Sequence, residues 1–111
     1  MILENEFLKI TFTPYGASIM SIVVKKLNRE IVYGYLNEEE YKENKDYFGC
    51  VVGRSTGRIR NGVIYDNDEK YELTKNFENK HTLHGGFGLH NKEFSYEIKE
   101  KKLFFLDIHL I

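Results

Sequence analysis

The sequence contains very little of the residues that cross-link or break a chain: one cysteine and one proline among 111 residues, and no tryptophan. Cys50 has no second cysteine for an internal disulfide, which predicts a reducing compartment, with the cytoplasm as the expected location. Because Cys50 lies in the apolar run Phe48–Val52, we expect a buried structural thiol rather than a reactive one.

The sequence also lacks an excess of charge of one sign. Its 16 basic and 17 acidic residues nearly cancel, which argues against nucleic acid or an anionic membrane as a partner. No apolar stretch approaches the length of a membrane span. Met1-Ile2-Leu3 is followed at once by Glu4, so the beginning of the chain is not expected to be a signal peptide.

Aromatic residues, in contrast, are plentiful, with eight tyrosines and eight phenylalanines. They favour strands, and period-two alternation of apolar and polar residues predicts an all-β fold. The expected strands and hairpin arms are 8–13, 18–24, 31–35, 47–52, 63–65, 70–73, 94–98 and 103–111. Turns are expected at 14–16, at 27–30 and at 66–69, the last joining a tight hairpin.

Two segments depart from this alternation. Asn37 and Glu40 resemble a capping box that opens a single helical turn, with Glu38–Glu40 as a solvated acidic face. The run from Leu103 to Ile111 is still apolar where the sequence stops, and a strand this hydrophobic is a hazard at an open edge. We therefore expect a chain interrupted in the middle of a fold.

The first candidate site segment is Gly53-Arg54-Ser55-Thr56-Gly57-Arg58-Ile59. Its glycines favour a loop over a helix. The guanidinium groups of Arg54 and Arg58 could hold hydroxyls or a carboxylate. The alternative is a structural arginine bonded to backbone carbonyls.

The second candidate segment is Thr82-Leu83-His84-Gly85-Gly86. We expect His84 to lie on a loop and to hydrogen-bond a polar ligand. The neighbouring His81 and His90 suggest a metal site, but their spacing does not match a zinc pattern, so we expect no metal and treat both as solvated loop residues. His109 is expected to be a surface or core histidine. Gly85-Gly86-Phe87-Gly88 lacks the Lys-Ser/Thr ending of a phosphate-binding loop.

These segments together resemble the aldose 1-epimerase (mutarotase) family. Residues 47–59 resemble its aromatic-glycine strand and its glycine-arginine-x-alanine-asparagine-arginine-isoleucine loop. The remaining matches follow in the family's order over nearly the whole chain: Tyr15-Gly16-Ala17, Ile31–Tyr35, Tyr71-Glu72-Leu73, Asn76 and Leu83–Gly86. The resemblance implies a large antiparallel β-sandwich of the galactose mutarotase type, incomplete in this chain, with residues 1–111 as the N-terminal part of a single domain.

The resemblance also implies site roles. Arg58 matches the family's substrate-binding arginine and His84 its substrate-binding histidine, while Gly57 stands where the family has a sugar-binding asparagine. Phe94 stands where relatives often carry a tryptophan. The implied substrate is a free hexose such as galactose or glucose, with no metal or organic cofactor.

The implied reaction is interconversion of α and β anomers by general acid–base catalysis. The family's base, a glutamate, and its acid, a second histidine, would both lie beyond the region present here, so this chain alone is expected to be inactive. The alternatives are a non-catalytic carbohydrate-binding or regulatory remnant, and a β-rich interaction domain that matches by accident.

Overall fold

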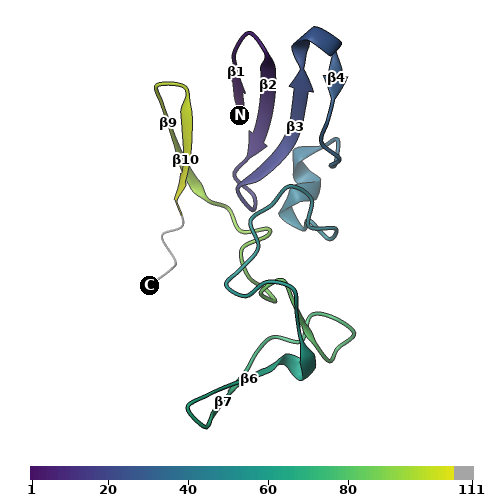
Figure 1. Ribbon diagram of the computed structural model, residues 1–111, viewed down its shortest axis with the longest axis vertical. Helices are drawn as coiled ribbons and strands as arrows, with labels where there is room; N and C mark the ends of the chain where they lie inside the picture. The colour runs from purple at the N-terminus through teal and green to yellow at the C-terminus, as the bar shows by residue number, and fades with distance from the viewer. Residues whose placement is uncertain (107–111) are drawn as a thin grey trace. The chain divides into compact units, whose positions relative to one another are not determined.

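The computed structural model describes residues 1–106, which form two compact units. The terminal unit comprises residues 1–51 and the chain from residue 90 onward, and the central unit comprises residues 52–89. Strands in each unit pair antiparallel, and the helical segments of residues 1–106 are 3-10 turns of three to five residues (Figure 1). The prediction of an all-β antiparallel fold is confirmed.

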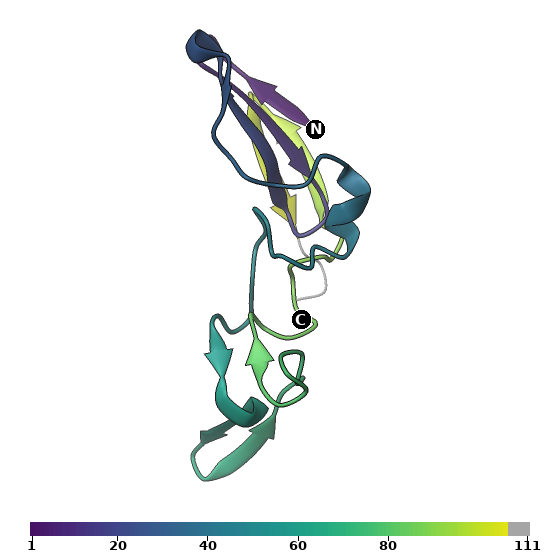
Figure 2. The same ribbon diagram turned by 90° about the vertical axis from the view of Figure 1, so that its right-hand side faces the viewer.

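The terminal unit contains a four-stranded sheet in the order β1-β2-β3-β4 and a separate hairpin, β9-β10 (Figures 1 and 2). These strands are β1 (Ile2–Glu4), β2 (Leu8–Thr13), β3 (Ser18–Val24), β4 (Arg29–Glu30), β9 (Ser95–Lys99) and β10 (Lys102–Leu106). Two 3-10 turns follow β3 and β4, namely η1 (Lys25–Leu27) and η2 (Glu38–Lys42).

Aromatic side chains connect the hairpin to the sheet. Phe105 on β10 meets Phe12 on β2 edge to face, with ring centroids 6.4 Å apart, and meets Phe94 at 6.3 Å. Phe94 is one of the few apolar side chains that are buried, at 8 % exposure. The hairpin and the sheet therefore form two layers around Phe94, as in a sandwich.

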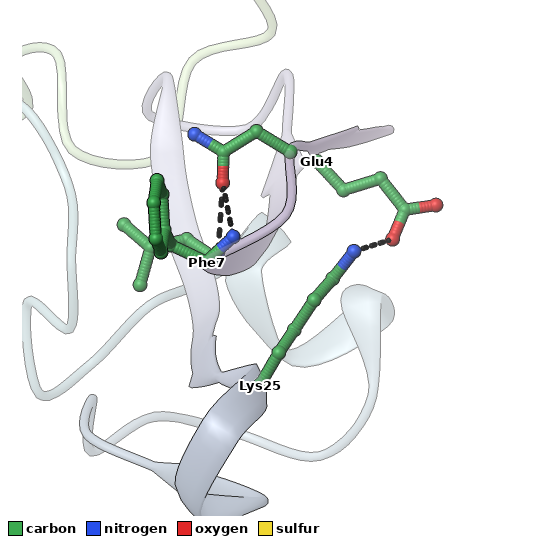
Figure 3. A network of polar contacts seen from close by, with 5 residues as sticks. Glu4, Phe7 and Lys25 are labelled. Atoms are coloured by element: carbon green, nitrogen blue, oxygen red, sulfur yellow. Dashed lines mark hydrogen bonds and ion pairs between the residues drawn. The ribbon is translucent and has the colours of Figure 1, made fainter.

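The first strand was not expected from the sequence, and its turn is held by polar contacts (Figure 3). The Oδ1 atom of Asn5 accepts hydrogen bonds from the backbone N–H groups of Phe7 and Leu8, at 2.9 and 2.8 Å. Lys25 forms a 2.9 Å ion pair with Glu4 and lowers the pKa of that carboxyl through this bond and its charge. These contacts join β1 to the end of β3.

The strand expected at 31–35 does not form, and that prediction was wrong. β4 ends at Glu30, whose carboxylate accepts the N–H groups of Ile22 at 2.8 Å and Val32 at 2.9 Å. The Ile31 N–H still donates to the carbonyl of Ile22 at 2.9 Å, but the Ile22 N–H that would complete this pair is directed to the Glu30 side chain, and the ladder goes no further.

The strand expected at 47–52 is also absent. Tyr47 and Gly49 have φ angles of 58° and 61°, which interrupt an extended chain. Gly49 lies against the backbone of Ile19, because the Ile19 N–H donates to the Gly49 carbonyl at 3.1 Å. A side chain at Gly49 would therefore collide with the carbonyl oxygen of Ile19. Cys50 is half-buried rather than buried, and burial raises the pKa of its thiol.

The helical turn expected after Asn37 is confirmed. Both bonds of the capping box are present between Asn37 and Glu40 at the start of η2, and the acidic residues Glu38–Glu40 are exposed as expected. Tyr41 on this turn is fully buried and contacts the ring of Tyr35 at 5.2 Å between centroids.

The central unit contains a short ladder and a hairpin. Its elements are β5 (Arg58–Ile59), η3 (Arg60–Gly62), β6 (Val63–Asp66), β7 (Glu69–Glu72) and β8 (Thr82–Leu83). The β6-β7 hairpin confirms the prediction of a tight turn here. Its central residues Asn67 and Asp68 both have positive φ, 48° and 67°, as hairpin turns of two residues require.

Few apolar side chains are buried in the described part of the chain. Tyr41 and Phe94 are buried, whereas Leu36 and Tyr33 are 95 % and 85 % exposed. No helix in residues 1–106 is long and apolar enough to cross a membrane. The prediction for 103–111 is confirmed as far as Leu106 in β10, while the rest of that segment, including His109, lies outside the described residues.

The carboxylate of Glu30 predicts a pH dependence of stability. Desolvation alone would raise its pKa, but bonds from the Ser21 hydroxyl and from the N–H groups of Val32, Ile22 and Ile31 outweigh it and lower the pKa below 4.5. A lowered folded-state pKa stabilises the fold above the unfolded pKa, and this stabilisation is lost as the pH falls through the folded value.

We therefore expect Glu30→Gln to lower the free energy of unfolding by about 0.5–1 kcal/mol at pH 7. The loss is small because the carboxylate is exposed. The penalty should shrink as the pH falls below the ordinary glutamate range. Urea unfolding at pH 7 and at a pH below that range measures the penalty. Glu6→Gln is the control, because Glu6 is exposed and forms no ion pair within residues 1–106. A penalty that does not change with pH would contradict this role.

Candidate functional site

The short ladder β5-β8 brings the two candidate segments together. Arg58 pairs with Leu83 and Ile59 with Thr82, in antiparallel register. Ile59 is half-buried and its partner Thr82 is buried at 2 % exposure, so the face that these two residues share is the packed one, and the exposed Arg58 and its partner Leu83 lie on the opposite face. The register places His84 next to the partner of Arg58, although the two residues are 26 positions apart in the sequence.

Gly57 and His84 hold one another through two hydrogen bonds. The N–H of His84 donates to the Gly57 carbonyl at 2.9 Å, and the N–H of Gly57 donates to Nδ1 of His84 at 3.3 Å. Because Nδ1 is an acceptor, the neutral imidazole carries its proton on Nε2. Gly57 has a φ of 64° and His84 a φ of 48°, so both residues are in the left-handed region.

Asn76 holds the other edge of β8. Its Nδ2 donates to the carbonyl of Leu83 at 2.9 Å and its Oδ1 accepts the Leu83 N–H at 2.8 Å, as a neighbouring strand would. The hydroxyl of Thr82 donates to the carbonyl of Thr74 at 2.7 Å. The strand that precedes His84 is therefore fixed on both edges, which limits where the imidazole can lie.

The guanidinium of Arg58 lies over the ring of Phe77, with Cζ 4.9 Å from the ring centroid. Arg58 is exposed, and within the described part of the chain it has no carboxylate partner. A cation that is stacked but not ion-paired keeps its N–H groups available for a ligand.

The other predicted residues are not part of β5 or β8. Arg54 is in a bend, so the expected loop is confirmed there, while Arg58 begins a strand. His81 is only 21 % exposed and accepts the N–H of Asn61 at 2.9 Å, so it is not simply solvated. His90, in the terminal unit, is buried at 8 % exposure against the ring of Tyr47, and its prediction as a solvated residue was wrong.

Within residues 1–106, no group of three or more His, Cys, Asp or Glu side chains is placed so that it could hold a metal ion. The sequence reasoning missed Phe77 as a neighbour of Arg58, and no motif in the sequence points to it. Asn76 was matched only as a block of the family resemblance, and its two bonds to the backbone of Leu83 were not predicted.

The sequence comparison decides the family. The family model for aldose 1-epimerase matches residues 1–109. The chain belongs to the aldose 1-epimerase family. Among curated relatives, it is 40 % identical over 84 residues to a probable aldose 1-epimerase of Arthroderma benhamiae, which covers 68 % of this chain and 19 % of that protein. It is 31 % identical over 87 residues to the galactose mutarotase of Homo sapiens, covering 76 % of this chain and 25 % of the relative.

Solved structures of this family share the fold. An aldose epimerase homologue from C. elegans superposes with a TM-score of 0.83 at 25 % identity, over 95 % of this chain and 34 % of that one. A galactose 1-epimerase from Lactobacillus acidophilus NCFM superposes with a TM-score of 0.75 at 24 % identity, over 86 % of this chain and 28 % of its own. The chain thus spans about a fifth to a third of the length of these four relatives, and the prediction of a galactose mutarotase-type fold is confirmed.

The backbone at Gly57 predicts how this family member tolerates substitution there. A Cβ at Gly57 would meet no atom within 4 Å, so the cost of a side chain is conformational. We expect Gly57→Ala to lower the free energy of unfolding by about 1 kcal/mol, because alanine is disfavoured in the left-handed region. Gly57→Asn should cost less, since asparagine adopts this conformation more readily. Urea unfolding of the two variants compares them, and equal losses would contradict the explanation.

Proposed function

We propose that this chain supplies the sugar-binding arginine and histidine of an enzyme that interconverts the α and β anomers of a free hexose. In this proposal residues 1–111 form the N-terminal part of one β-sandwich domain, and Arg58, His84 and the backbone of Gly57 line the substrate site. Family membership and the β5-β8 ladder, which joins the two candidate segments, support it.

The chemistry of the two side chains suits a neutral sugar. Hydroxyl oxygens accept hydrogen bonds, and Arg58 offers several N–H donors that no carboxylate of the described chain occupies. His84, with its proton on Nε2, adds a donor of a different geometry. Relatives named galactose mutarotase favour galactose as the first sugar to test.

The proton transfer itself is assigned to residues outside this chain. The glutamate base and histidine acid that the resemblance implies have no counterpart in it, and general acid–base catalysis requires groups within hydrogen-bond reach of the substrate. The proposed activity therefore belongs to a protein in which this chain is joined by the remainder of the fold, while the chain alone binds sugar.

In a protein of family length that carries this chain, Arg58→Ala and His84→Ala should each slow anomer exchange roughly tenfold or more, because each removes a ligand hydrogen bond. Equilibration of a pure galactose anomer followed by NMR measures the rate. Arg60→Ala is the matched control, an exposed arginine two residues away. Near-normal rates in both site variants would remove these residues from the site.

The alternative is a non-catalytic carbohydrate-binding or regulatory remnant. Isothermal titration of the chain with galactose and glucose tests it. Heat that disappears in Arg58→Ala would support binding through this site, and no heat at millimolar sugar would eliminate the remnant as a sugar binder.

A further inference from the structure

The position of the Arg58 guanidinium depends on a single contact in the described chain. No ion pair or side-chain hydrogen bond within residues 1–106 restrains this exposed side chain, and its partner is the ring of Phe77 at 4.9 Å. An arginine side chain loses rotamer entropy when it is ordered. A group that orders it before a ligand arrives therefore reduces what binding must overcome.

Phe77 contacts His81 through both its backbone and its ring. Its N–H donates to the carbonyl of His81 at 3.0 Å and its carbonyl accepts the His81 N–H at 2.9 Å, which closes a narrow bridge just before β8. The imidazole of His81 accepts the N–H of Asn61 in η3 at 2.9 Å, and its ring lies 6.4 Å from the ring of Phe77. The ring of Phe77, over which Arg58 lies, is thus fixed next to β8, the strand that leads into His84.

A contact with an aromatic ring can position the guanidinium of Arg58 without using the N–H donors that would bind a ligand. The Cζ atom of Arg58 lies over the ring of Phe77, and this contact uses the positive charge of the guanidinium rather than its N–H donors, which form a planar fork. A carboxylate partner would fix the same cation but would occupy those donors. An aromatic platform orders the cation and leaves its donors for the ligand.

We propose that Phe77 is a positioning residue that sets the Arg58 guanidinium for sugar binding, and this rests on the proposed function of Arg58. The alternative is that Phe77 only closes its bridge with His81 and has no effect on the ligand.

The test compares Phe77→Leu and Phe77→Tyr with the wild-type chain Met1–Ile111. Leucine keeps an apolar side chain without a π face, and tyrosine restores the face. Tyr65→Leu is the matched control, because Tyr65 is 72 % exposed on β6 and has no ring contact among the described residues. Galactose affinity is measured by titration, and NMR follows the side-chain resonances of Arg58 with the backbone amides of Ile59 and Thr82.

We expect Phe77→Leu to weaken galactose binding about two- to fivefold, the range of an exposed cation–π contact. It should shift the Arg58 side-chain resonances, which lose the ring current, and leave the amides of Ile59 and Thr82 in place. Phe77→Tyr should restore both the affinity and the shifts, and Tyr65→Leu should change neither.

Three results would overturn the proposal. Unchanged affinity in Phe77→Leu would eliminate the positioning role and leave the proposed function intact. Weakened binding with displaced amides at Ile59 and Thr82, unrescued by tyrosine, would show that Phe77 acts through the fold alone. No galactose binding by the wild-type chain would overturn this inference and the proposed sugar site together.

Discussion

Both units depend on hydrogen bonds from short polar side chains to backbone N–H and C=O groups, more than on the packing of apolar side chains. Asn44 in the terminal unit is fully buried, donating to the carbonyl of Phe48 at 3.0 Å and accepting its N–H at 2.8 Å. Asn76 makes the same pair of bonds to Leu83 in the central unit. With so few apolar side chains buried in residues 1–106, these amides fix loops that a hydrophobic core would otherwise order.

This dependence explains which elements could be predicted from the sequence. The strands β2 and β3, the β6-β7 hairpin and the capping box of η2 depend on alternation, turn residues and caps that are written within a few positions. The expected strands at 31–35 and 47–52 failed because apolar composition indicates burial but not pairing. The Glu30 carboxylate accepts the N–H groups of Ile22 and Val32 where the first would pair, and positive φ angles at Tyr47 and Gly49 interrupt the second.

The site was predictable to a similar degree. Glycines around Arg58 and His84 marked two segments where a ligand could approach, and the family resemblance ordered them, but neither could show that Arg58 would pair opposite Leu83. The stack of Arg58 on Phe77 could not be predicted, because it depends on the narrow bridge between Phe77 and His81, which places the ring beside a strand 19 residues earlier. Contacts of this kind arise from loop geometry, for which a single sequence has no periodic signal.

The same contacts explain how the site can differ from its relatives at Gly57. The resemblance places an asparagine there, and a φ of 64° is a conformation that asparagine adopts, so the backbone does not itself demand glycine. What glycine removes is an amide side chain, while the backbone N–H that orients His84 remains. In the proposed site, the side-chain donors for a ligand are then concentrated in Arg58 and His84. On that proposal, their placement by Phe77 and by the Gly57 backbone matters more than in a site where a third side chain shares the ligand.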